Sequence, residues 1–374
     1  MFRIPYLMTI GIDASRAFVK NKTGIEEYSY QIIKHLRSYL RHEKVILYLD
    51  PRINKSELID FELPGDWEIK FLRAPIFWTQ IRLSVQMIFH PVDVLFIPAH
   101  TIPIIRPKKS FVVVHGLEYE FCPKAYSFFG KLYMRFVIKN SCRWAEKIIS
   151  VSENTEKDLM KLYKVPVGKI KMIYNGIENK FKIQSSKFKT LESLRDENFL
   201  LFVGRLEERK NICGIIEAFE FLKSKYNVPY KLVLAGNFGY GAERIKNKIK
   251  GSKHEEDIIQ VGYVSDEEKR ALLRGAGVFL FPTFYEGFGL PIVEAQSVGV
   301  PVVTSNVSSM PEVAGDGAVL VDPKKSENIA EAAYKLMTDK EARDDIINKG
   351  HENVKRFSWD ACAREVSKLL ISNE

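Results

Sequence analysis

Short apolar runs alternate with helical patterns along almost the whole chain, and this alternation limits the folds open to it. Several runs are continuously apolar, as in strands that are buried on both faces of a parallel sheet. Helical patterns such as 24–39, 131–147 and 330–337 fill the gaps, which indicates an α/β fold with right-handed crossovers. The expected strands are 9–14, 45–50, 68–73, 94–98, 111–115 and 148–152, then 200–205, 231–236, 258–264, 277–282, 301–305 and 318–322.

The length of 374 residues favours two domains rather than one core. A polar stretch at 180–198 interrupts the pattern, so we place the boundary and a hinge there. The prediction is two Rossmann-like, doubly wound domains, 1–180 and 190–356, which face a central cleft with the carboxyl ends of their strands.

Charge and cysteine content suggest an intracellular protein with an anionic partner. Residues 1–180 carry 28 Lys and Arg against 18 Asp and Glu, so the basic excess of the chain lies in this half. Nucleic acid, anionic lipid or an anionic acceptor would each suit it. The four cysteines form no metal or disulfide pattern, which fits a reducing cytoplasm. We identify no signal peptide and no membrane-spanning run.

The sequence EGFGLPIVE, from Glu286 to Glu294, follows an apolar strand and opens a helix. Glycines leave backbone amides uncovered, and Pro291 suits the first helical turn. A strand, a glycine-rich turn and a helix N-terminus together predict a phosphate site. Because phosphate repels carboxylates, the two glutamates are expected to bind sugar or ribose hydroxyls.

The sequence GRLEERKN, from Gly204 to Asn211, also follows a strand and supplies cations. Fixed positive charge from Arg205 and Lys210 would stabilise a departing diphosphate more than the ground state. The chain has no DxD motif to hold a metal for the same purpose, so no metal is expected.

These two motifs, about eighty residues apart, resemble the retaining GT-B glycosyltransferases with an E-x7-E motif, known as family 4 or glycosyl transferases group 1. Residues 261–305, 308–323, 151–159 and 174–177 extend the resemblance over most of the chain. It implies a GT-B fold, a hexosyltransferase activity, an N-terminal acceptor domain and a last helix (359–374) that packs back on that domain.

The resemblance also implies roles for individual residues. Arg205 and Lys210 hold the donor diphosphate, Glu294 binds the ribose, and Glu286 contacts the donor sugar. Residues 11–15 and the turn around Gly24 lie near the diphosphate and the acceptor. Amides that contact phosphate or sugar belong to Gly287, Phe288, Gly289 and Leu290.

His115 ends the predicted strand 111–115 and is expected to contact the donor sugar near its reacting carbon. Many relatives have Asp after this histidine, whereas this chain has Gly116, and either Glu118 or Glu120 could substitute. The resemblance implies a front-face displacement, but a covalent intermediate on a carboxylate stays an alternative.

A basic stripe with aromatic residues runs along the predicted helix 131–147. Lysine or arginine recurs every four residues there, with Phe128, Phe129, Tyr133, Phe136 and Trp144 interleaved. We favour a solvated basic face with the aromatic rings in the core. The alternative is peripheral contact with an anionic membrane, which would suit a lipid-linked acceptor.

The resemblance favours mannose transfer from GDP-mannose to a saccharide or lipid-linked saccharide, as in bacterial polysaccharide, lipopolysaccharide and O-antigen synthesis. UDP-hexoses and dTDP-rhamnose are alternative donors. Two competing functions are a non-catalytic nucleotide-sugar-binding subunit and a GT-B epimerase or phosphorylase. A Rossmann dehydrogenase is disfavoured because GNFGYGAE has the wrong glycine order, and no nucleic acid is expected.

Overall fold

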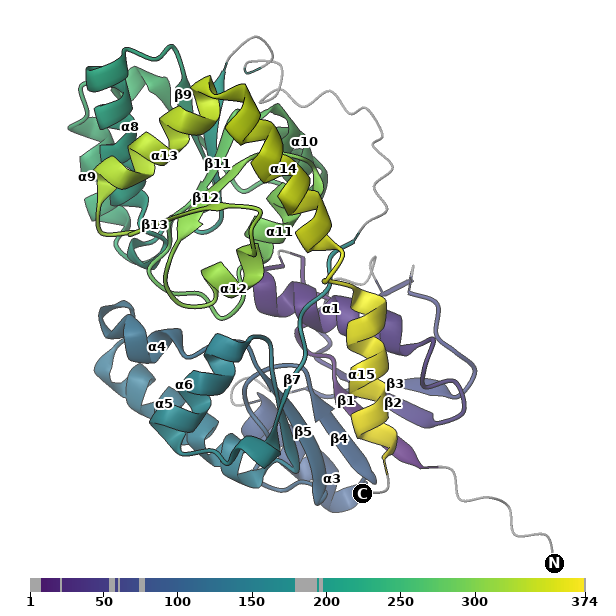
Figure 1. Ribbon diagram of the computed structural model, residues 1–374. Helices are drawn as coiled ribbons and strands as arrows, with labels where there is room; N and C mark the ends of the chain where they lie inside the picture. The colour runs from purple at the N-terminus through teal and green to yellow at the C-terminus, as the bar shows by residue number, and fades with distance from the viewer. Residues whose placement is uncertain are drawn as a thin grey trace, which may run out of the picture. The chain divides into compact units, whose positions relative to one another are not determined.

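The computed structural model describes residues 8–20, 22–53, 58–59, 61–73, 78–178, 194 and 198–372 (Figure 1). The chain divides into two compact units, and neither is continuous in sequence. Unit 1 comprises Met1–Leu117, Phe128–Gly176 and Ser358–Glu374, and unit 2 comprises Glu118–Ser127 and Ile177–Phe357. Most of the predicted boundary and hinge at 180–198 lies outside the described residues.

Unit 1 is built on a seven-stranded sheet of order β3-β2-β1-β4-β5-β6-β7, in which every pair is parallel. Its strands are β1 (Thr9–Asp13), β2 (Lys44–Leu49), β3 (Trp67–Phe71), β4 (Val94–Ile97), β5 (Lys109–Val114), β6 (Lys147–Ser150) and β7 (Ile170–Met172). Its helices are α1 (Gly24–Leu36), the π-helical turn η1 (Trp78–Leu83), α3 (Ser84–Phe89), α5 (Phe128–Trp144), α6 (Glu153–Tyr163), the 3-10 turn η3 (Val167–Lys169) and α15 (Trp359–Ile371).

The last helix, α15, packs against α1 in unit 1. The ring of Trp359 meets that of Tyr28 edge to face at 5.6 Å, and the hydroxyl of Tyr39 donates to Asp360 at 2.7 Å. The start of α15 also touches the end of the unit 1 core. A β-carbon at Gly176 would lie 2.0 Å from the Trp359 nitrogen, so this approach requires glycine.

Unit 2 is built on a six-stranded parallel sheet of order β10-β9-β8-β11-β12-β13. Its strands are β8 (Phe199–Val203), β9 (Lys231–Ala235), β10 (Ile258–Gly262), β11 (Val278–Phe281), β12 (Val302–Ser305) and β13 (Val319–Val321). Its helices and 3-10 turns are α4 (Glu118–Phe121), η2 (Pro123–Ala125), η4 (Glu208–Lys210), α8 (Ile212–Tyr226), α9 (Ala242–Lys250), η5 (Glu255–Asp257), α10 (Asp266–Gly275), α11 (Leu290–Ser297), α12 (Met310–Ala314), α13 (Ser326–Thr338) and α14 (Lys340–Val354).

The central strands β1, β4, β8 and β11 are buried nearly throughout because their side chains are apolar on both faces. The α/β prediction is confirmed, and all twelve expected strands are present within two residues of their predicted bounds. Sequence reasoning missed β7, whose three residues include an exposed Lys171.

Each sheet has one point where the strand order reverses, between β1 and β4 in unit 1 and between β8 and β11 in unit 2. Open parallel sheets bind their ligands outside the carboxyl ends of the strands at such a point. Among the described residues, no helix combines the length and apolarity that a membrane crossing requires.

Candidate functional site

The site predicted in unit 2 lies where the strand order reverses, because its two motifs follow β8 and β11. After β8, the chain makes the turn η4 and then enters α8 through Asn211, which has φ 59°. The Asn211 amide donates to the carbonyls of Pro282 and Pro323 at 3.1 and 2.6 Å. These two bonds fix the end of η4 against the segment that follows β11.

The loop after β11 is anchored by serines at the start of α12. Ser309 donates to the carbonyls of Glu286 and Phe288 at 2.9 and 2.7 Å, and Ser308 donates to the Glu286 carbonyl at 2.7 Å. Gly289 has φ 109°, which favours glycine, and α11 begins directly after it. The turn predicted over Gly287 to Leu290 therefore has a defined backbone path into a helix.

A buried ion network joins the two motifs. The Lys210 ammonium pairs with Oε1 of Glu286, and the Arg209 guanidinium lies 3.0 Å from the same oxygen. Arg209 also contacts Glu207 at 2.8 Å and donates to the Tyr285 carbonyl at 2.6 Å. The side chains of Lys210 and Glu286 are only 12% and 13% exposed. One carboxylate is thus held between two cations.

The ion network and its burial shift the pKa values of both Lys210 and Glu286. Burial lowers the pKa of Lys210, and attraction to Glu286 opposes that effect only in part. Burial alone would raise the pKa of Glu286, but Arg209 and Lys210 outweigh it and the pKa is lowered. Glu286 is therefore ionised at neutral pH.

Arg209 was not among the predicted site residues, although it stands in the same motif. Its pKa is raised because Glu286 and Glu207 outweigh its burial. Arg205, which was predicted, lies outside the buried network. Its side chain is 61% exposed, and its nearest described carboxylate, Glu207, is 4.0 Å away. It is an accessible cation at the carboxyl end of β8.

Glu294 lies on α11 and pairs with Lys269 of α10 at 2.7 Å. Lys269 also contacts Asp266 at 3.1 Å, and these two carboxylates raise its pKa against the effect of burial. The structure thus gives Glu294 a cationic partner that sequence reasoning missed. The spacing offered no signal, since Lys269 precedes Glu294 by 25 residues.

The segment Glu118–Ser127 packs on unit 2 beside the loop after β11. The ring of Phe121 stacks on that of Tyr285, with centroids 4.4 Å apart and planes at 13°. Glu118 contributes to the field that raises the pKa of Arg209. This residue, proposed as a substitute for the missing aspartate, therefore acts on the network electrostatically, and Phe121 contacts the residue before Glu286.

In unit 1, His115 follows β5 and lies among other rings. Its Nε2 is 2.8 Å from the Pro98 carbonyl, and its ring meets Tyr28 at 4.6 Å and His100 at 5.4 Å. These contacts fix the orientation of the ring. Gly24 is the first residue of α1, where Thr23 and Glu26 form a capping box.

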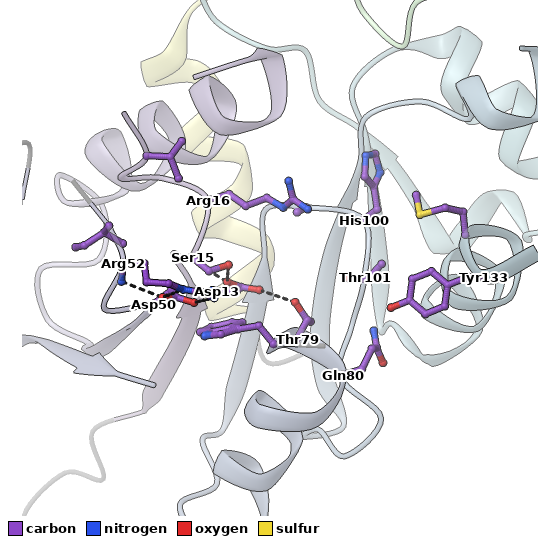
Figure 2. A pocket seen from close by; sticks show the side chains of 15 residues that line it. Asp13, Ser15, Arg16, Asp50, Arg52, Thr79, Gln80, His100, Thr101 and Tyr133 are labelled. Atoms are coloured by element: carbon purple, nitrogen blue, oxygen red, sulfur yellow. Dashed lines mark hydrogen bonds and ion pairs between the residues drawn. The ribbon is translucent and has the colours of Figure 1, made fainter. Parts of the chain in front are cut away.

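A cavity of about 420 Å³ opens where the strand order of unit 1 reverses (Figure 2). Its walls come from the residues after β1, β2 and β4, from η1 and from α5. Asp13 lies at its floor, as the end of β1, and Oδ1 accepts from the Ser15 amide and hydroxyl at 3.0 and 2.6 Å. The predicted segment 11–15 thus leads into a pocket.

The helix α5 does not place its aromatic rings in the core, so the interpretation favoured above is wrong. Phe128 and Phe129 are 77% and 79% exposed, and Leu132, Tyr133 and Phe136 are exposed as well. Only the second half of the helix is buried, through Val137, Ile138, Ser141 and Cys142.

Comparison with known proteins identifies the family. Residues 22–181 match the family model described as Glycosyltransferase Family 4, and residues 184–353 match Glycosyl transferases group 1. The chain is 31% identical over 265 residues to O-antigen chain mannosyltransferase B of Escherichia coli, which covers 70% of this chain and 69% of that protein. The chain is a family 4 glycosyltransferase.

Other relatives agree with this assignment. The transferase is 30% identical over 280 residues to the capsular polysaccharide biosynthesis glycosyltransferase CapM of Staphylococcus aureus, with 71% and 70% of the two chains covered. Its fold matches Anabaena HepE in complex with UDP and glucose, at a TM-score of 0.74, 18% identity and coverage of 98% and 100%. WaaG, a glycosyltransferase involved in lipopolysaccharide biosynthesis, matches at a TM-score of 0.72, 15% identity and the same coverage.

The predictions of a GT-B fold and of a hexosyltransferase are confirmed by these matches. The transferase is related to O-antigen mannosyltransferases. The roles predicted for individual residues stay predictions, and so does the division into an acceptor domain and a donor domain.

Proposed function

We propose that the transferase moves a hexose, with mannose favoured, from a nucleotide-diphosphate sugar to a saccharide or lipid-linked saccharide with retention of configuration. The observation that carries the proposal is the Lys210–Glu286–Arg209 network at the β8/β11 reversal point. The names of relatives that act in O-antigen mannosylation support mannose and suggest GDP-mannose as the donor.

The network suits a donor whose leaving group is a diphosphate. Without a donor, the charge of Lys210 is matched by Glu286. A bound diphosphate brings further negative charge, so Lys210 turns to phosphate, and Arg205 approaches from solvent. Glu286 keeps Arg209 and gains the freedom to accept hydrogen bonds from sugar hydroxyls. As the glycosidic bond breaks, fixed cations stabilise the oxygen that gains charge.

Glu294 and Lys269 extend the site to the nucleoside. A carboxylate accepts hydrogen bonds from vicinal hydroxyls, and the ion pair with Lys269 orients the Glu294 carboxylate. We assign the ribose to Glu294 on this basis. Lys269 is then a positioning residue, since it acts through Glu294.

Three cations, Arg205, Arg209 and Lys210, provide the charge that a divalent metal supplies in other transferases. We therefore propose turnover without added metal. Activity that disappears in EDTA and returns with Mg²⁺ or Mn²⁺ would contradict this part of the proposal.

The first experiment is a thermal-shift and turnover screen with GDP-mannose, UDP-glucose, UDP-GlcNAc and dTDP-rhamnose. One nucleotide family should raise the unfolding temperature, since a ligand at about 100 times its Kd adds about 2.7 kcal/mol. Lys210→Met should lower turnover by about 10²–10³, and Lys355→Met is the matched control on an exposed helix end. Binding without transfer to any acceptor would favour a non-catalytic subunit, and loss of sugar without an acceptor would favour an epimerase or a hydrolase.

We further propose that unit 1 contacts an anionic membrane through a surface formed by η1, α3, residues 102–108 and α5. Hydrogen bonds join these segments: Gln80 donates to Ile102, the Ile102 amide to Ser141, and the Ile105 amide to Ser84. Exposed apolar side chains on this surface include Ile81, Ile88, Phe89, Ile104, Phe128, Phe129 and Phe136.

Charge supports an anionic bilayer as the partner. The ranges 78–89, 102–108 and 128–144 contain Arg82, Arg106, Lys108, Lys131, Arg135, Lys139 and Arg143 and no acidic residue. Exposed apolar rings beside basic residues are typical of interfacial helices. Each basic residue near an anionic surface contributes about 1 kcal/mol.

Sedimentation with vesicles tests this surface. Binding to vesicles that contain phosphatidylglycerol should exceed binding to phosphatidylcholine alone and should fall with salt. A double variant, Phe128→Ser with Phe129→Ser, should lose binding, whereas Phe71→Ser on the edge strand β3 is the exposed aromatic control. Equal binding by both variants would contradict the proposal.

A further inference from the structure

A second cavity of unit 1 lies at the amino edge of the sheet, on the side opposite to the carboxyl ends of the strands. Its lining comes from residues 104–108, which precede β5, and from residues 143–146, which precede β6. Because β5 and β6 are parallel neighbours, the two segments meet where both strands begin. The volume of this amino-edge cavity, about 580 Å³, falls within the range of small-molecule pockets, roughly 300–1,000 Å³. It is separate from the carboxyl edge, where open parallel sheets bind their ligands.

Three cations without an ion-pair partner line the amino-edge cavity. They are Arg106, Lys108 and Arg143, and in the described part of the chain no carboxylate forms an ion pair with any of them. Burial lowers the pKa of Arg106, and no carboxylate offsets this effect. The arginines of the cavity at the reversal point differ, since Arg16 and Arg52 are each paired with a carboxylate. The charge of the amino-edge cavity is therefore free to attract an anion.

The guanidinium of Arg106 is held in a fixed position. It lies 4.5 Å from the centre of the Trp144 ring, and one of its N–H groups donates to the Ile104 carbonyl at 2.5 Å. A guanidinium has five N–H donors, so the contact with Ile104 leaves others for two oxygens of a phosphate group. Because the side chain is already oriented, it loses less conformational entropy when it binds an anion.

Lys169 offsets the two negative features of this cavity. The helix α5 ends at Trp144, and the C-terminus of a helix would by itself repel an anion. The Lys169 ammonium donates to the carbonyl of Arg143 in that last turn at 2.7 Å. Burial lowers the pKa of Lys169, and the nearby Glu146, the acidic residue of the lining, opposes this effect. With its rim, the cavity thus brings together four cations and one carboxylate.

We propose that the amino-edge cavity is a phosphate site, in which Arg106 forms a bidentate pair with the phosphate group while Lys108 and Arg143 add positive charge beside it. The transfer reaction does not require this site, so the inference goes beyond the donor network. The phosphate group belongs either to a soluble compound or to a lipid headgroup. Ile104 and Ile105, which are 56% and 45% exposed, line the same cavity and offer contact to acyl chains. A lipid source would place the site within the membrane surface proposed above.

Phosphorus NMR titrations on the full chain test the proposal without turnover. The probes are inorganic phosphate, glycerol 3-phosphate and dihexanoyl phosphatidic acid, a soluble lipid with the same phosphate group as glycerol 3-phosphate. Because the proposed donor site also takes phosphate groups, each titration is repeated with Lys210→Met, which weakens that site. Glycerol 3-phosphate should still bind to Lys210→Met, and Arg106→Gln should weaken its binding by about tenfold or more.

Two further variants distinguish a built site from diffuse positive charge. Arg41→Gln is the matched control, because Arg41 is an exposed arginine that precedes β2 at the same edge of the sheet, and it should bind like the wild type. Arg106→Lys keeps the charge but loses the planar fork, so it should bind more weakly than the wild type. An unchanged unfolding temperature shows that each variant is folded. If no phosphate probe binds to Lys210→Met, or if Arg106→Gln and Arg41→Gln weaken binding equally, the proposal is overturned.

The two glycerol phosphates identify the source of the phosphate group. A lipid source predicts tighter binding of dihexanoyl phosphatidic acid than of glycerol 3-phosphate, and the double variant Ile104→Ser with Ile105→Ser should remove the difference. Equal binding of the two probes assigns the site to a soluble phosphate. Phe128→Ser with Phe129→Ser should lose vesicle binding and keep the glycerol 3-phosphate titration. Absent vesicle binding with a normal titration therefore contradicts the membrane surface alone, and the reverse result contradicts the phosphate site alone.

Discussion

The Lys210–Glu286 pair should separate stability from catalysis when its two partners are replaced one at a time. Glu286→Gln leaves Lys210 buried without its paired carboxylate, and its remaining close contact among the described residues is the Phe281 ring, 5.0 Å away. Breaking a buried pair from one side costs about 3–5 kcal/mol. We expect a loss near 3 kcal/mol, because the ring contact offsets part of the cost and because Lys210, whose pKa is already lowered, can release its proton.

Lys210→Met should be milder. Glu286 keeps the Arg209 guanidinium at 3.0 Å, so its charge stays matched. The expected loss is about 1 kcal/mol, the size of one hydrogen bond. Turnover should fall even though the protein remains stable. Lys210→Met should lower it by about 10²–10³, as for removal of one fixed charge at a developing anion. Arg205→Met should lower turnover to a similar extent.

The positions of the tryptophans allow the unfolding of unit 1 to be distinguished from that of the whole chain. All four, Trp67, Trp78, Trp144 and Trp359, belong to unit 1. In urea titrations, tryptophan fluorescence therefore follows unit 1, whereas circular dichroism follows both units. Glu286→Gln should shift the dichroism transition more than Lys210→Met does. If Lys210→Met is the more destabilising of the two, or if it retains wild-type turnover, the assignment of Lys210 to the departing diphosphate is refuted.

Three further predictions concern the surroundings of the network. Lys269→Met should raise the KM for the donor about tenfold with little change in kcat, because it acts through Glu294; an unchanged KM would contradict this role. Phe121→Ala should remove the stacking on Tyr285, which is worth about 0.5–1.5 kcal/mol, and should lower turnover, whereas Phe121→Tyr should restore it. The pKa of Glu286 is lower in the folded protein than in the unfolded chain. Its ionised carboxylate therefore stabilises the fold at pH values above the unfolded pKa, and this stabilisation is lost as the pH falls through the folded pKa. In Glu286→Gln, the free energy of unfolding should consequently decrease less steeply as the pH is lowered.

The strands were predictable because each lies in a sheet buried on both faces, so that apolar runs such as 199–203 and 278–281 stand out from the polar turns. The motifs after β8 and β11 were predictable for the same reason, since a polar turn after such a strand marks the ligand edge. The short strand β7 was missed because it is at the sheet edge and carries little apolar signal.

Other features depend on contacts distant in sequence, which local patterns do not encode. Lys269 meets Glu294 only because the fold brings one residue of α10 to one residue of α11. The packing of Glu118–Ser127 on unit 2 interrupts a segment that otherwise belongs to unit 1. The exposure of the aromatic rings in the first half of α5 depends on which other segments cover that half, and the spacing of those rings is the same for a core helix and an interfacial one.

The two units show how one topological rule yields two kinds of site. In each sheet, the connections that follow the two strands at the reversal point run in opposite directions, and they leave a space that side chains of those turns line. In unit 2, those turns place Arg209 and Lys210 on one shared carboxylate, Glu286, and leave Arg205 exposed nearby, so an arriving diphosphate meets three cations within a few residues. In unit 1, the equivalent turns carry cations that are each matched by an acid, and the floor is Asp13. The fold therefore decides where each space lies, and the balance of charge in a few turn residues decides how strongly that space attracts an anion.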